Sequence, residues 1–247
     1  MKTAIVAGVV MMGAFVARDA SAFELGTPES QHPYRSPQNF ALELRFSPYY
    51  PQIDEEPGLA GHPYEDAFGD KARFYIGAEF DWQIYRIPHI GTIGPGVSVG
   101  SVGMSRNAVT KSGRESGDEY SLHIYPFTAV AVFRGDGLWH DRGFPLVPYG
   151  KIGLGYGIWR ASNTGGTSES QGVSGKGSTW GTNVALGISF ALDSLDSGAT
   201  RNMDNAIGIN NTFLFLEYYW LSLNGLGQSN ALYVGSQSWA AGLAFEF

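Results

Sequence analysis

The chain has 247 residues, 34 of them glycine, no cysteine, and a formal net charge of −7. The acidic balance argues against nucleic-acid binding, which needs a cationic surface, and without cysteine no disulfide can stabilise the fold. The length suits one all-β domain.

The N-terminal segment has the features of a secretory signal peptide. Lys2 precedes an apolar run over 3–16, and Ala20-Ser21-Ala22 forms a small-x-small cleavage site. The run is shorter than the roughly 20 residues of a spanning helix. We therefore expect a signal peptide over 1–22, export of the chain, and an N-terminal lead over 23–39.

From residue 40 onward, apolar side chains alternate with small or polar ones, which is the period of a strand with two different faces. Seven segments show this pattern, and segment 97–104, which is rich in Gly and Ser, is added as a candidate strand; their lengths are near the roughly 9–11 residues of a membrane-spanning strand. They are 40–46, 74–87, 97–104, 120–133, 147–159, 179–192, 212–221 and 239–247.

The two faces of these strands differ in kind. The apolar face carries large side chains, as in Ile152, Leu154 and Ile158, whereas the other face is mostly Gly, Ala and Ser with a few charges. Small interior residues suit a narrow barrel better than a soluble sandwich, and aromatics near strand ends are typical of membrane interfaces. In segment 120–133 we assign Leu122, Ile124, Val130 and Val132 to the outer face and His123, Tyr125, Phe127 and Ala129 to the inner face. Segment 97–104 has no clear phase.

The connections between strands alternate in length. Long polar connections are expected at 48–73, 105–119, 160–178 and 222–238, and shorter ones at 88–95, 134–146 and 193–211, the last with a short helix. These elements predict an eight-stranded antiparallel up-and-down transmembrane β-barrel over 40–247. Its four long loops would be extracellular and both termini periplasmic.

The last strand ends in alternating apolar residues, with Gly242, Phe245 and Phe247 matching the assembly signal of bacterial outer-membrane barrels. The chain thereby resembles small outer-membrane barrels of the OmpA, OmpX and OmpW type. Segments 148–156 and 208–218 also resemble uncharacterised myxobacterial barrels. The resemblance implies a bacterial outer-membrane location and contact with membrane lipid, lipopolysaccharide and the barrel assembly machinery.

Six charged side chains fall on the predicted inner face, and burial requires that they pair or contact water. They are Glu43, Arg45, Glu79, Asp81, Lys151 and Glu217. We expect a salt-bridge network that plugs the lumen; a gated small conductance is the alternative. Within this network Lys151 and Arg45 are the expected cations.

Catalytic and ligand motifs are weak. The five histidines lack metal-ligand spacing, so no metal or cofactor is expected. Ser121 and His123 share a strand face, which leaves a hydrolase as a minor alternative. Arg134-Gly135-Asp136 spells an integrin-binding tripeptide but is interpreted as a turn. Loop charges are interpreted as solvated, with cation or lipid-phosphate contacts as alternatives; they are Asp54, Glu55, Glu56, Glu65, Asp66, Asp70, Lys111, Arg114 and Lys176.

These observations favour a monomeric, non-enzymatic barrel with a structural or surface-interaction role through its four loops. The OmpW likeness implies one alternative, a narrow channel or carrier for small or hydrophobic solutes. A lipid-modifying barrel enzyme is the second alternative. An apolar interior pocket would favour the carrier, and a Ser-His-acid triad at the lipid-facing rim would favour the enzyme.

Overall fold

The computed structural model describes residues 39–109, 115–170, 173–194, 208–228 and 231–247. The expected signal peptide and nearly all of the N-terminal lead lie outside these residues, and so do Lys111 and Arg114.

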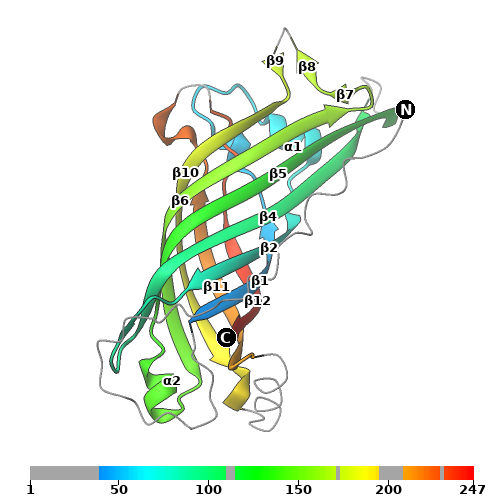
Figure 1. The fold of residues 1–247 in the computed structure, drawn as a ribbon. Coiled ribbons are helices and arrows are strands. Elements are labelled where there is room, and N and C mark those ends of the chain that lie inside the picture. Colours follow the sequence, from blue (N-terminus) through cyan, green and yellow to red (C-terminus); the bar gives the residue numbers. More distant parts are fainter. Residues whose placement is uncertain (1–38, 110–114, 171–172, 195–207, 229–230) are drawn as a thin grey trace.

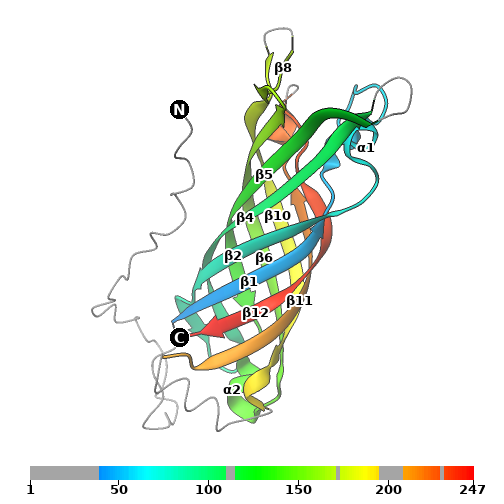
Figure 2. The same ribbon diagram turned by 90° about the vertical axis from the view of Figure 1, so that its right-hand side faces the viewer.

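Eight long strands form a closed antiparallel barrel within the described residues (Figures 1 and 2). They are β1 (Phe40–Tyr49), β2 (Arg73–Trp82), β4 (Gly91–Val109), β5 (Glu115–Arg134), β6 (Leu146–Asn163), β10 (Lys176–Ala191), β11 (Asn211–Ser222) and β12 (Ser236–Glu246). Each long strand pairs with the next one along the chain, and β1 pairs with β12 to close the sheet. The predicted eight-stranded up-and-down barrel is confirmed.

Short strands and helices lie at the two ends of the barrel. Strand β3 (Tyr85–Ile87) pairs with β4, β7 (Gly166–Thr167) pairs with β6, and β8 (Glu169–Ser170) pairs with β9 (Val173–Ser174). The helical pieces are η1 (Gln52–Glu55), α1 (Pro63–Phe68), α2 (Gly137–Arg142), η2 (Leu192–Ser194) and η3 (Gly225–Gly227). None of the helices in the described part of the chain is long and apolar enough to cross a membrane.

The outer wall is apolar, as the alternation predicts. Ile76, Ile152, Leu186 and Leu214 are each more than half exposed, although they are large aliphatic side chains. Such a belt cannot be left in water around a whole molecule, and lipid is the solvent that suits it. The fold is that of a transmembrane β-barrel.

The barrel wall is taller on one side than on the other. Strands β4, β5 and β6 have 19, 20 and 18 residues, whereas β1 and β2 have 10 each. Much of the expected loops 105–119 and 160–178 is therefore strand, and β4 already begins within the expected turn 88–95. The polar sequence misled the prediction because above the membrane both strand faces meet water. The short helix predicted in 193–211 stays a prediction, because residues 195–207 are not described; residues 193 and 194 end the 3-10 helix η2.

The predicted phase of β5 is wrong. Leu122 and Ile124 are buried, whereas His123, Tyr125 and Phe127 face outward, the last two 40% and 38% exposed. Val130 and Val132 are likewise buried and Ala129 is exposed. Both faces of this strand are largely apolar, so alternation alone could not choose between them; an apolar cluster inside the barrel does. The unassigned phase of β4 is now defined, with Val102 and Met104 inside and Val97 and Val99 outside.

Candidate functional site: a charged layer inside the barrel

Seven charged side chains from five strands meet inside the barrel among the described residues. They are Glu43 and Arg45 (β1), Glu79 and Asp81 (β2), Arg134 (β5), Lys151 (β6) and Glu217 (β11), all at most 7% exposed. We call this set the charged layer. It contains all six residues of the predicted lumen charge network.

Lys151 and Arg45 each bridge several carboxylates. Lys151 Nζ lies 2.7 Å from Glu43 Oε2, 2.5 Å from Glu79 Oε1 and 3.3 Å from Glu217 Oε2. Arg45 Nη1 donates to Glu79 Oε2 over 2.7 Å, and its Nη2 contacts Glu217. Burial without such partners would be very costly, so each cation compensates charges contributed by other strands.

Arg134 is a third cation in the layer that sequence reasoning missed. Its Nη2 donates to Glu43 Oε1 over 2.5 Å and to Asp81 Oδ2 over 2.7 Å. The expectation that Arg45 is the sole inward basic companion of Lys151 is therefore wrong. The sequence placed Arg134 in the turn 134–146, whereas in the structure it ends β5, and the inverted phase of that strand turns its side chain inward. Arg134 and Asp136 are each only 2% exposed, so the tripeptide 134–136 is buried rather than presented.

Small residues opposite the charges make room for them. Arg45 pairs in register with Gly77 on β2 and with Gly242 on β12, while Glu217 pairs with Gly187 and Ala240. At Gly242 a Cβ would meet the backbone oxygen of Leu44. The small residues of the predicted inner face thus frame the long ionic side chains.

The other two residues of the expected assembly signal lie on the outer side of β12. Phe245 is half-buried, and the Phe247 ring lies 6.1 Å from that of Phe40. Their role in assembly stays a prediction.

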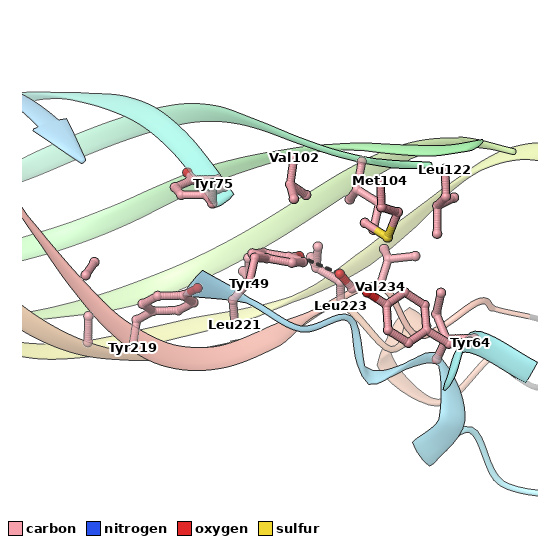
Figure 3. Close-up of a cluster of buried hydrophobic side chains, with 14 residues drawn as sticks. Tyr49, Tyr64, Tyr75, Val102, Met104, Leu122, Tyr219, Leu221, Leu223 and Val234 are labelled. Carbon is pink, nitrogen blue, oxygen red and sulfur yellow. Dashed lines mark hydrogen bonds between the residues drawn. The ribbon is translucent and has the colours of Figure 1, made fainter. Parts of the chain in front are cut away.

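An apolar cluster fills the barrel on the α1 side of the charged layer (Figure 3). Tyr49 stacks on Tyr75 with ring centroids 5.8 Å apart, and its hydroxyl donates to the carbonyl of Val234. Tyr64 from α1 reaches into the same cluster and is 2% exposed. Burial raises the pKa of Tyr64 to about 12, so the phenol stays neutral. The first loop therefore closes this mouth instead of extending away from it.

A second apolar cluster fills the opposite end. Tyr149, Phe213 and Phe215 are buried there, with Tyr149 and Phe215 in edge contact at 6.5 Å. Trp139 of α2 packs against Phe213 at the same centroid distance. Helix α2 thus covers the base of the barrel, where Figure 2 shows it. Together with the charged layer, these clusters fill the lumen at three levels.

Among the described residues, two groups of His, Asp and Glu side chains lie close enough together to suit a cation. Glu43, Glu79 and Asp81 form one, but their carboxylates already contact Lys151 and the two arginines. Asp54, His62 and Glu65 form the other. The Asp54 carboxylate accepts the backbone N–H groups of Tyr64 and Glu65 at 2.7 and 3.0 Å, so it holds the start of α1.

The expected lumenal position of His123 is wrong, because its side chain is exposed on the outer wall. An open hollow of about 520 Å³ lies beside His123, and Ser105 and Ser121 line it together with the imidazole. Neither serine hydrogen-bonds His123 in the described part of the chain, and the imidazole stacks on Tyr125 at 6.5 Å. A nucleophile–base pair would require that hydrogen bond.

Comparisons with known proteins return only structural similarity. No family model matches the chain, and no curated protein matches it. Ail of Yersinia pestis, in complex with the heparin analogue sucrose octasulfate, is 14% identical, with 85% of this chain and 97% of that chain covered and a TM-score of 0.42. The N-terminal barrel of Pseudomonas aeruginosa OprF is 13% identical, with 85% of this chain and 98% of that chain covered and a TM-score of 0.43. The outer membrane protein OprG from the same organism is 12% identical, with 86% of this chain and 97% of that chain covered and a TM-score of 0.48.

Proposed function

We propose that the chain is a sealed bacterial outer-membrane barrel with a non-enzymatic role, either in envelope structure or in surface contacts made by its extracellular loops. The observation that carries this proposal is the filled lumen. Charged side chains at the middle and apolar clusters at both ends leave no continuous polar path among the described residues.

The filled lumen also favours a sealed barrel over both forms of the solute alternative, a channel and a carrier. A channel needs a water-lined path, and the three cations of the charged layer are instead each engaged by carboxylates. A carrier needs an empty apolar pocket near a mouth, and the apolar cluster there is occupied by Tyr49, Tyr64 and Leu223. A non-enzymatic role is supported by a missing contact: within the described residues, neither Ser105 nor Ser121 hydrogen-bonds His123, although they line the same hollow.

Planar-bilayer recording of the reconstituted protein tests the sealed barrel. We expect no resolvable single-channel steps from the wild-type protein under conditions in which an open porin conducts. The positive control is the variant Lys151→Met, which is expected to let ions through if it still folds. Regular conductance steps from the wild-type protein would favour the channel alternative.

A serine-reactive fluorophosphonate probe tests the enzyme alternative. We expect no labelling of the folded barrel and no difference between wild type and Ser121→Ala. Labelling that depends on both Ser121 and His123 would contradict the non-enzymatic role.

A further inference from the structure

The tall wall of the barrel carries basic residues in one row across three strands. In the strand register, His123 of β5 pairs with Arg160 of β6, which pairs with Lys176 of β10. All three side chains are exposed on the outer face. We call His123, Arg160 and Lys176 the basic row. Directly opposed residues in neighbouring antiparallel strands lie about 4.5–5.5 Å apart, so the row is a compact feature.

Along the same outer face, the residues on the barrel-middle side of this row are aromatic, and those on its other side are polar. Four residues toward the barrel middle, Phe127, Tyr156 and Trp180 form an aromatic row by the same register. Trp180 is 52% exposed. Aromatic rings of this kind lie at the membrane–water interface. The basic row is therefore placed just beyond the hydrocarbon, at the depth of lipid headgroups.

Two residues further out, the wall presents hydroxyls. Ser105, Ser121 and Ser162 are successive register partners on β4, β5 and β6. The open hollow of about 520 Å³ is lined by Ser105, Ser121 and His123, and by Gly103, which pairs with His123 and carries no side chain. Hydrogen-bond donors and space for a headgroup thus adjoin the basic row.

Arg160 is held in place within this arrangement. Its Nε and Nη2 donate to Thr167 Oγ1 over 3.1 and 2.6 Å, which fixes the guanidinium along the strand. Among the described side chains of β5, the acidic Glu119 lies on the same face, further out beside the hydroxyls, and lines the hollow. The short wall differs, because its corresponding outer end carries Phe74, Trp220 and Trp239, which are exposed aromatics.

We propose that the basic row binds the phosphate of an anionic, phosphate-bearing lipid in the leaflet at the α1 end of the barrel. Arg160 and Lys176 supply charge-assisted hydrogen bonds, and the serine hydroxyls bind the polar group that carries the phosphate. The inference rests on the proposed membrane location and adds to it a lipid class and a single side of the barrel.

The test measures lipid retained by the full chain refolded in detergent micelles, using native mass spectrometry during titration with diphosphoryl lipid A. We expect Arg160→Gln/Lys176→Gln to bind about tenfold more weakly or worse than wild type. The matched control, Lys71→Gln/Arg142→Gln, removes the same charge from exposed positions elsewhere and should bind like wild type.

Four outcomes would overturn the proposal. Equal binding by the row variant would show that the row makes no contact, and an equal loss in the control would show that only net charge matters. Displacement of lipid A by an equal concentration of inorganic phosphate would identify a free-anion site. If the glutamine pair does not fold, Arg160→Lys/Lys176→Arg keeps both charges and should retain at least half of the wild-type binding; a tenfold loss there would also overturn it. Failure of the wild-type barrel to insert into lipid would refute the membrane location, separately from the row.

Discussion

Replacing Lys151 by Met removes a cation of the charged layer whose single nitrogen contacts three carboxylates. Its Nζ lies within 3.3 Å of oxygens from Glu43, Glu79 and Glu217, and its side chain is fully buried. The variant leaves four carboxylates facing Arg45 and Arg134 among the described residues. Removing one partner of a buried ion pair costs about 3–5 kcal/mol, because the remaining charge has lost its partner but is still kept away from water. That is roughly two to four orders of magnitude in the unfolding equilibrium.

Urea unfolding in detergent micelles, followed by tryptophan fluorescence, measures this loss. The control is Lys71→Met, at an exposed position in the first loop, where the change should stay within about 0.5 kcal/mol. The double variant Lys151→Met/Glu217→Gln should recover part of the stability, because one unpaired charge is removed as well. A loss below about 1 kcal/mol for Lys151→Met, with no recovery in the double variant, would refute the view that the layer is ionic and coupled.

Further predictions concern packing and topology. Gly153→Val should reduce the fraction of heat-modifiable folded barrel on gels, because a Cβ at Gly153 would meet the backbone of Ala129 at 2.0 Å. Gly117→Ala is its control, since no atom lies within 4 Å of that Cβ, and equal losses would contradict the packing argument. Trypsin added to intact cells should cleave after Lys71, at the α1 end, and spare Arg142 in α2. Cleavage at Arg142 alone would invert the proposed orientation.

The strand positions follow from the sequence because alternation is local. Each of the eight predicted segments overlaps one long strand, and the last is strand β12 through Glu246. Segment 74–87 is the exception in length, because β2 ends at Trp82 and residues 85–87 form the separate short strand β3. The inner positions of Glu43, Lys151 and Glu217 follow from the same alternation, since each stands among residues that differ clearly from their neighbours. One interior and one lipid-facing side are enough to determine such a strand.

The tertiary structure decided what alternation could not. Segment 120–133 is apolar on both sides, so its phase depends on the cluster formed by Val102, Met104 and Tyr64, which come from other parts of the chain. With that phase, Arg134 joins the charged layer and His123 moves to the outer wall. Strand length above the membrane was equally undetermined, because both faces of the hairpins meet water there. Closure of the barrel sets which residues meet across it, and that depends on register between strands far apart in sequence.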